Sequence, residues 1–257
     1  MMPRKYRVLI PNGLTFLSLL CGTCSILVSA AIPEAADAPG YLWVAGLLIL
    51  ASYLIDWCDG MVARFLHVST AFGLQLDSLV DMVSLGLAPA VLLFVYGLRV
   101  AGASPWLSGP VVVLVPLAGA FRLARFNLLP PKTTGRTESV GLTISTAGAL
   151  LALAVLSNLA ADAAPSAIVY LCVTVGISLL MVSTIPFPAL AWFFMGWRTT
   201  VVILGLIGAS LVGLPFFTAW LVWTSAYVGL PWSVRPQAVS GKANPELLRV
   251  LGLTGAS

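Results

Sequence analysis

Four aspartates lie close together in a chain that carries very little charge elsewhere. They are Asp56, Asp59, Asp77 and Asp81, and the runs on either side of them, ASYLI and MVSLGLAPAVLLFVY, are apolar enough to lie in lipid. Only 9% of the 257 residues are charged. Ionisable side chains at membrane depth are energetically costly and are therefore functional candidates by default. This stretch constrains the fold and the function more than any other.

The spacing of the four aspartates predicts a helical hairpin. Asp56 and Asp59 are three residues apart, and Asp77 and Asp81 are four apart, so each pair shares one helix face. A turn near residue 68 would bring all four carboxylates to a similar depth, roughly 13–20 Å along the helices at 1.5 Å per residue. Four carboxylates in so small a volume repel one another, and two divalent cations would cancel their charge. An all-oxygen ligand set without His or Cys favours magnesium or manganese over zinc.

Small residues accompany the aspartates on the predicted carboxylate face. Gly60 and Ala63 follow Asp59 within about one turn of helix, and Gly73 comes one turn before the second aspartate pair. Positions without bulk would let the diphosphate of a ligand approach the metals and the backbone. Arg64, one turn after Gly60, could meet a phosphate oxygen.

These residues resemble the signature of one family of membrane enzymes, the CDP-alcohol phosphotransferases: Asp56-x-x-Asp59-Gly60-x-x-Ala63-Arg64, eight residues, then Gly73-x-x-x-Asp77-x-x-x-Asp81. The family moves a phosphatidyl group from a CDP-linked lipid to an alcohol. The resemblance implies that Asp56, Asp59 and Asp77 are metal ligands. It also implies that Asp81 shares the second metal and is the base for the acceptor hydroxyl. A homodimer is a further implication.

An alternative explanation of the four aspartates is an ion pathway or proton relay, as in an ion-coupled transporter. Such a protein would use the carboxylates for coupling and would not release CMP. A relay has no need of the interleaved Gly60, Ala63, Arg64 and Gly73, so the spacing favours the enzyme.

The composition predicts an all-α integral membrane protein. The chain is 60% apolar, with a mean hydropathy of +1.02, which is far above that of a soluble domain. Residues 1–230 are predicted to form one transmembrane domain, and residues 231–257 a cytoplasmic tail. Eight spans are expected, at about Val8–Ile32, Tyr41–Leu66, Ala71–Leu98, Gly109–Phe126, Val140–Leu159, Ala167–Val182, Thr199–Val212 and Pro215–Leu230.

The distribution of basic residues predicts the orientation of this helical bundle. With the N-terminus in the cytoplasm, twelve of the thirteen Lys and Arg residues fall in inward-facing segments, and only Arg99 lies outside. Cytoplasmic segments carry such an excess of positive charge. We therefore expect an inner-membrane protein with both termini, and the aspartate cavity, facing the cytoplasm.

The first predicted span carries polar residues near its cytoplasmic end. Pro11, Asn12 and Thr15 resemble the first-helix motif of the family, and the resemblance implies contact with the CDP-lipid. From the residue types alone, Asn12 is better explained as a helix cap.

A second polar region, FRLARFN, ends the fourth predicted span. Arg122 and Arg125 are three residues apart and share a face, and positive-inside anchors that extend to lipid head groups are the alternative. The segment resembles the phosphatidylserine synthase branch of the family, as do SLGLAP and MVSTIPFP. GLTISTAG resembles a GLP-type segment of that branch, with Thr143 where proline is usual. The resemblance favours a site role for Arg122 and Arg125 over anchoring. Because the planar fork of arginine matches phosphate and carboxylate groups, we expect Arg122 and Arg125 to bind donor phosphate and Arg136 to bind the serine carboxylate.

The expected partners are therefore CDP-diacylglycerol, L-serine and membrane lipids, and no nucleic acid. Another acceptor alcohol is possible on the same chemistry, namely glycerol 3-phosphate, inositol phosphate or choline. The donor could also be an archaeal-type CDP-lipid.

Overall fold

The computed structural model of the chain describes residues 4–33, 38–68, 70–128, 138–160, 167–184 and 186–188. These residues form helices and one pair of very short strands: α1 (Arg4–Ala30), α2 (Ala38–Leu66), α3 (Ala71–Asp81), the π-helix η1 (Met82–Leu87), α4 (Ala88–Arg99), α5 (Pro105–Leu128), β1 (Glu138–Val140), α6 (Ile144–Ala160), α7 (Ala167–Val182) and β2 (Pro186–Pro188). The predicted all-helical class is confirmed apart from the two strands.

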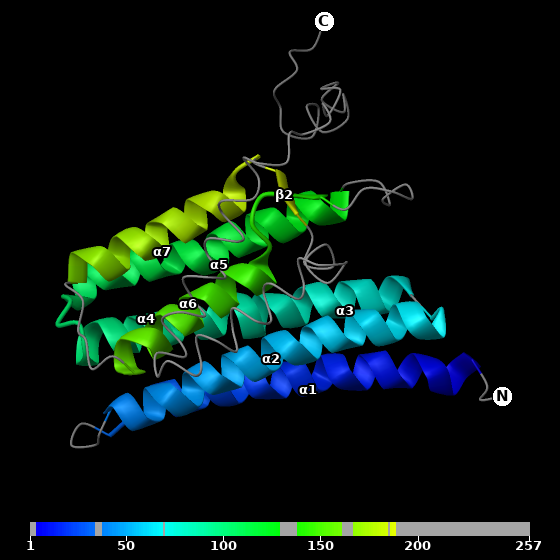
Figure 1. The fold of residues 1–257 in the computed structure, drawn as a ribbon, viewed down its shortest axis with the longest axis horizontal. Helices are drawn as coiled ribbons and strands as arrows, with labels where there is room; N and C mark the ends of the chain where they lie inside the picture. The colour runs from blue at the N-terminus through cyan, green and yellow to red at the C-terminus, as the bar shows by residue number, and fades with distance from the viewer. Residues whose placement is uncertain are drawn as a thin grey trace, which may run out of the picture.

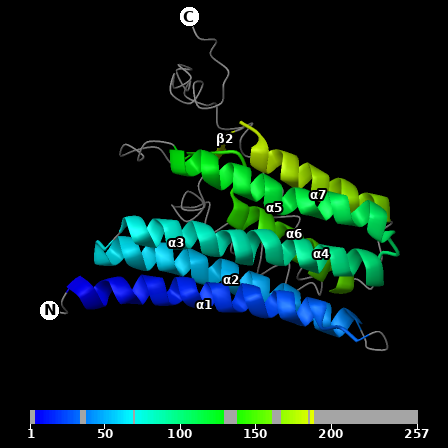
Figure 2. The same ribbon diagram turned by 180° about the vertical axis from the view of Figure 1, so that it is seen from behind.

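The helices lie side by side in a layered bundle (Figure 1). The α1 helix forms one edge and α7 the other, and both views place α4 and α6 between the α1–α2 side and the α5–α7 side (Figures 1 and 2). The start of α1, the turn between α2 and α3, and the end of α5 lie at the same end of the bundle. Three segments that the sequence assigns to one side of the membrane therefore lie at one end of the bundle.

Four segments are long and apolar enough to cross a membrane: Val8–Ala30, Ala38–Ala63, Ala71–Arg99 and Pro105–Asn127. Two shorter apolar helices follow, Ile144–Ala160 and Ala167–Val182. These six agree in order and place with the first six predicted spans. The predicted spans at 199–212 and 215–230, and the tail at 231–257, lie outside the described residues.

Small polar side chains hold the first helices together. Ser18 of α1 and Ser52 of α2 have their hydroxyl oxygens 2.7 Å apart, and Ser25 donates to the Ala45 carbonyl at 2.9 Å. Gly22 lies against the backbone of Ser84, so that even a Cβ at this position would collide. Small residues permit this close approach of helices in a membrane, where interhelical hydrogen bonds replace a hydrophobic driving force.

The turn of the aspartate hairpin lies where the spacing predicts it. The α2 helix ends at Leu66, His67 takes a positive φ of 54°, and α3 begins at Ala71. The Thr70 hydroxyl caps α3 by accepting a hydrogen bond from the Gly73 amide at 3.0 Å, as N-cap residues do.

The strand pair ties the segment before α6 to the end of α7. Glu138 pairs with Pro188 and Val140 with Pro186 in an antiparallel register. The Leu142 amide adds a hydrogen bond to the Leu180 carbonyl at 3.0 Å. The predicted span at 140–159 therefore begins later, at Ile144, because residues 138–140 are extended.

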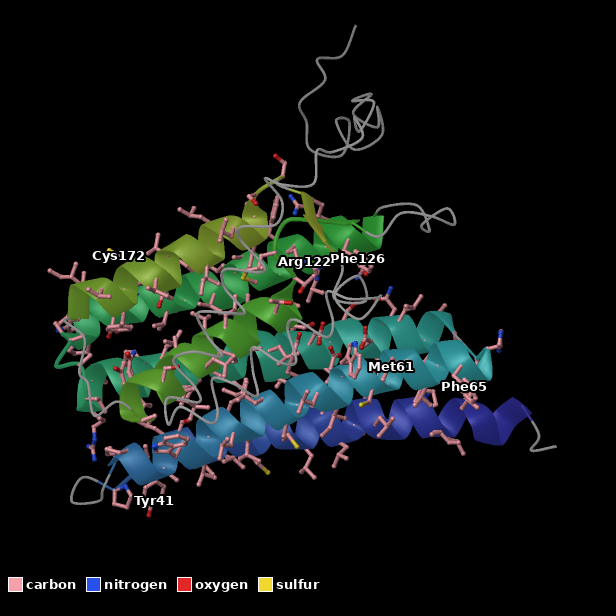
Figure 3. All side chains as sticks on the ribbon, viewed as in Figure 1. Tyr41, Met61, Phe65, Arg122, Phe126 and Cys172 are labelled. Carbon is pink, nitrogen blue, oxygen red and sulfur yellow. The ribbon has the colours of Figure 1, made fainter. Side chains whose placement is uncertain are left out.

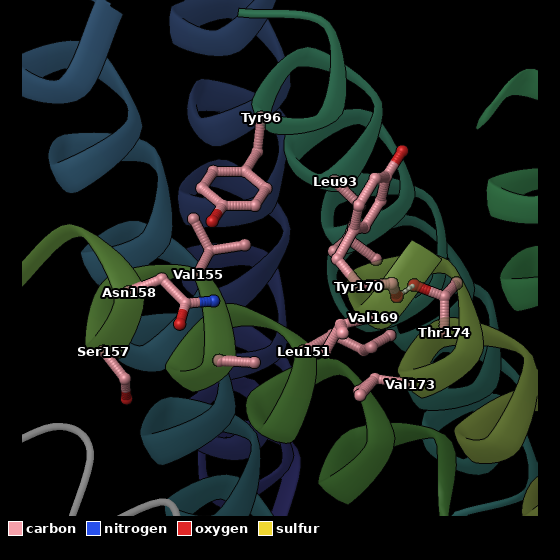
Figure 4. A pocket seen from close by; sticks show the side chains of 11 residues that line it. Leu93, Tyr96, Leu151, Val155, Ser157, Asn158, Val169, Tyr170, Val173 and Thr174 are labelled. Carbon is pink, nitrogen blue, oxygen red and sulfur yellow. Dashed lines mark hydrogen bonds between the residues drawn. The ribbon is translucent and has the colours of Figure 1, made fainter. Parts of the chain in front are cut away.

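A cavity of about 190 Å³ lies between α4, α6 and α7. Its walls are mainly apolar, with the rings of Tyr96 and Tyr170 edge-to-face at a centroid distance of 6.0 Å (Figure 4). Leu93 is the lining residue of α4 nearest to Asp81 in sequence, twelve residues on, or about 18 Å along a helix. The cavity is therefore separate from the aspartate cluster.

Candidate functional site

The α2–α3 hairpin brings three aspartates into one cluster. Asp56, Asp59 and Asp77 each offer a carboxylate oxygen, and these oxygens all lie within 4.8 Å of one another. A magnesium ion bonds its ligand oxygens at about 2.0–2.1 Å, which places neighbouring ligands about 3 Å apart and opposite ligands about 4.2 Å apart. The three aspartates would therefore have to draw closer together to hold one divalent cation. The predicted convergence of the two helix faces is confirmed for these three aspartates.

Asp59 is fixed by a hydroxyl from another helix. Its side chain is buried, and Thr15 of α1 lies with its hydroxyl 2.7 Å from Asp59 Oδ2 and 3.0 Å from the Pro11 carbonyl. A hydroxyl has one proton, and the shorter contact is to the charged acceptor. Thr15, expected from sequence to meet the donor, is therefore placed to orient an aspartate of the cluster.

Asp81 lies beside the cluster and is held separately. It is the last residue of α3, it is 7% exposed, and its Oδ2 accepts a hydrogen bond from Ser145 of α6 at 3.2 Å. Its Oδ1 is buried and has no hydrogen-bond partner among the described residues. Asp56 lies close enough to Asp81 for the two side chains to interact. Asp81 therefore has one oxygen anchored by Ser145, while its side chain also lies against the carboxyl group of Asp56.

The two arginines at the end of α5 have different surroundings. Arg122 is 8% exposed, and its guanidinium carbon lies 5.6 Å from the centroid of the Phe126 ring (Figure 3). It is near enough to Asp81 for its charge to act on that carboxylate. Arg125 donates to the carbonyls of Val182 at 3.0 Å and Ser183 at 3.1 Å, at the end of α7. Cations suit the carbonyl-rich end of a helix. Arg122 thus belongs to the aspartate region, and Arg125 links α5 to α7.

Of the remaining candidate residues, the structure describes Asn12, Gly60, Ala63 and Gly73 but not all of the others. Asn12 is half-buried, and a Cβ built on Gly73 would lie 3.5 Å from its Oδ1, so the first helix does reach the aspartate hairpin. Gly60 and Ala63 are half-buried on α2. The side chain of Arg64 and the whole of Arg136 lie outside what the structure describes.

Two features of the site are absent from the sequence-based prediction. One is Ser145, which contacts Asp81 across 64 positions of sequence. The other is η1, which follows Asp81 directly. A π-helical segment inside a longer helix often occurs at a functional site, but no residue pattern marks its start here.

Comparison with known proteins gives consistent findings. The sequence model of the CDP-alcohol phosphatidyltransferase family matches residues 8–177. A protein named CDP-diacylglycerol–serine O-phosphatidyltransferase from Helicobacter pylori is 32% identical over 217 residues, 82% of this chain and 84% of that protein. A protein of the same name from Mycobacterium leprae is 30% identical over 250 residues, 91% of this chain and 79% of the relative. A protein named archaetidylserine synthase from Methanothermobacter thermautotrophicus is 32% identical over 186 residues, 70% of each chain.

Proposed function

The chain belongs to the CDP-alcohol phosphatidyltransferase family, and from this membership we propose that it transfers a phosphatidyl group from CDP-diacylglycerol to L-serine, giving phosphatidylserine and CMP. The observation that carries the proposal is the cluster of Asp56, Asp59 and Asp77, with Asp81 beside it. Serine as the acceptor is supported by the names of the relatives.

Divalent cations, which we propose to be two magnesium or manganese ions held by the four aspartates, would neutralise the charge of the donor diphosphate and of the departing CMP. Asp81 would accept the proton of the serine hydroxyl through its Oδ1, the oxygen without a protein partner. The hydroxyl oxygen then bonds to the phosphorus of the phosphatidyl group as the bond to CMP breaks. An alcohol is a poor nucleophile at neutral pH, so a positioned base is needed.

We assign the CDP-lipid to the face formed by α1, α2, α3 and the end of α5. Asn12 and Thr15 line it from α1, and the small residues Gly60, Ala63 and Gly73 leave room for the diphosphate. Arg64 and Arg122 would meet phosphate oxygens. Arg125 would reach the donor only by breaking its hydrogen bonds to α7. We therefore assign it a smaller contribution to CDP-lipid binding than Arg122. Arg136 would meet the serine carboxylate.

We further propose a protein of about eight spans in the cytoplasmic membrane, with a transmembrane domain over 1–230 and a cytoplasmic tail over 231–257. The cavity and both termini would face the cytoplasm. The excess of Lys and Arg in the inward segments supports this orientation. A homodimer is proposed on family resemblance alone.

The first prediction concerns the substrates. Purified protein with CDP-diacylglycerol and magnesium or manganese should release CMP when L-serine is added, and not when serine is omitted. The same assay should include glycerol 3-phosphate, inositol phosphate and choline, and an ether-linked archaeal-type CDP-lipid as a second donor, since one relative is named archaetidylserine synthase. Turnover of glycerol 3-phosphate without turnover of serine would exclude the proposed acceptor and leave the aspartate chemistry standing. Absence of CMP release with every acceptor would favour the transporter alternative.

The second prediction separates donor-binding from acceptor-binding arginines. An arginine can bind a carboxylate or a phosphate through two parallel hydrogen bonds, and lysine cannot reproduce this geometry. Arg122→Lys should raise the KM for CDP-diacylglycerol about tenfold or more, and Arg136→Lys should mainly raise the KM for serine, since losing a charge-assisted hydrogen bond costs about 1.5–3 kcal/mol. Both KM values are measured by CMP release. Arg99→Lys is the control, because Arg99 bonds to the Pro33 carbonyl at 2.7 Å at the far end of α4. Equal effects of Arg122→Lys and Arg136→Lys on both KM values would contradict the assignment.

A further inference from the structure

We infer that Ser145 is a positioning residue for the reaction: it holds Oδ2 of Asp81 so that Oδ1 is directed toward the cluster where the acceptor hydroxyl must lose its proton. This inference rests on the proposed function of Asp81 as the base. It does not depend on which alcohol is the acceptor.

The contact itself is direct. The Ser145 hydroxyl donates to Asp81 Oδ2 at 3.2 Å, and Oδ1 of the same carboxylate is buried without a partner among the described residues. A carboxylate rotates about its last bond unless one oxygen is fixed. A hydrogen bond to Oδ2 therefore decides where Oδ1 points, and the side-chain interaction with Asp56 shows that Asp81 borders the cluster.

Ser145 is itself held firmly in place. It lies in the first turn of α6, where the Thr143 hydroxyl accepts from the Thr146 amide at 3.3 Å and donates to the Thr146 hydroxyl at 2.7 Å. Just before this turn, the Leu142 amide bonds to the Leu180 carbonyl of α7. The start of α6 is thus tied both to itself and to a neighbouring helix.

The helix that carries Ser145 also meets the segment that follows Asp81 at close range. A Cβ built on Gly86 of η1 would lie 3.2 Å from the Ile144 side chain, and a Cβ on Gly148 would collide with the Leu85 carbonyl. Two backbones this close fix the distance between Ser145 and Asp81. The π-helical segment and the start of α6 therefore act together as the support of the base.

The Thr15 contact provides an internal comparison. Each of the two most buried aspartates of the site receives one hydroxyl from a different helix, Thr15 to Asp59 and Ser145 to Asp81. Asp59 belongs to the three-aspartate cluster, whereas Asp81 stands beside it. Loss of the first hydroxyl should act on metal binding, and loss of the second on turnover.

The third prediction follows from this difference. Ser145→Ala should lower kcat about 10–100-fold, the usual cost of removing a group that orients a site residue, with the KM of both substrates within about twofold. Ser145→Thr, which keeps the hydroxyl, should restore most of kcat. The Mn²⁺ affinity of the three-aspartate cluster, which does not include Asp81, should be unchanged in Ser145→Ala when it is measured by electron paramagnetic resonance on the protein without substrates. Thr15→Val should lower it about 10–100-fold.

Matched controls keep the test decisive. Ser157→Ala removes a hydroxyl from the same helix, which among the described residues donates to the Leu153 carbonyl of its own helix, and should leave kcat unchanged. If Ser145→Ala loses helix content, Ser145→Cys keeps the side-chain size with a weak donor and takes its place.

A wild-type kcat in the folded variant would overturn the inference. So would a reduced Mn²⁺ affinity with kcat restored at high Mn²⁺. Failure of the wild type to use serine would overturn the proposed acceptor instead, and kcat would then be measured with the alcohol that the wild type does use.

Discussion

Asp81→Asn should abolish turnover while the protein stays folded and keeps its metal. The amide preserves the shape of the side chain and still accepts the hydrogen bond from Ser145 at the position of Oδ2, but it cannot take a proton. Removal of a general base costs about 10²–10⁴-fold in rate, so CMP release with serine should fall by at least about a hundredfold. This is the fourth prediction and the largest effect expected from any single substitution in this chain.

The three-aspartate cluster provides the control for this result. Asp77→Asn replaces a charged carboxylate of the cluster by a neutral amide, which is a weaker metal ligand, so it should weaken Mn²⁺ binding and be partly rescued by raised magnesium or manganese. Asp81→Asn should keep most of the Mn²⁺ affinity, because Asp56, Asp59 and Asp77 remain, and no metal concentration should restore its rate. If Asp81→Asn kept more than about a tenth of the wild-type rate, Asp81 would not be the base.

The aspartate hairpin could be predicted from the sequence because its determinants are local. Charged residues are rare in this chain, so four aspartates within 26 residues stand out, and helix periodicity then places each pair on one face. Apolar length was sufficient to locate six helices in the described part of the chain. Each of these inferences uses residues that are neighbours along the sequence.

The long-range contacts that hold the site in place could not be predicted in the same way. Ser145 is one of many serines in an apolar chain, and nothing in its neighbourhood points to Asp81. The pairing of residues 138–140 with 186–188 involves three-residue strands, which are too short to show an alternating pattern, and two of the residues are prolines, which usually argue against a strand.

The two arginines of FRLARFN show that residues on one helix face need not share a partner. Arg122 and Arg125 are three residues apart, and their shared face suggested a shared role in binding phosphate. In the structure α7 ends beside Arg125 and supplies carbonyls that bind its guanidinium, while Arg122 lies by Asp81. Long side chains that leave one face can reach different partners, and the position of α7 is a long-range feature of the fold.

Gly148→Ala should damage both stability and activity, although alanine is the better helix former. In a helix interior the change alone would favour the folded state by about 0.8–1.0 kcal/mol. At Gly148, however, the added Cβ would collide with the Leu85 carbonyl and lie 3.0 Å from the Leu85 Cα. These are backbone atoms of η1, which cannot rotate away, so α6 and η1 must separate. Overpacking of this kind costs about 1–3 kcal/mol.

The separation of α6 from η1 should also disturb Asp81, the proposed base. Ser145 lies one turn before Gly148 on α6, and its hydrogen bond to Asp81 is already 3.2 Å long, so a shift of a few tenths of an ångström would break it. We therefore expect Gly148→Ala to lower the midpoint of thermal unfolding and to lower kcat at least as far as Ser145→Ala does. Gly176→Ala is the matched control, because a Cβ at Gly176 of α7 meets nothing within 4 Å, and it should leave both quantities unchanged or raise the midpoint slightly. A Gly148→Ala protein with the stability and kcat of Gly176→Ala would show that α6 and η1 are not in close contact. It would also contradict the inference that this contact keeps Ser145 within hydrogen-bonding distance of Asp81.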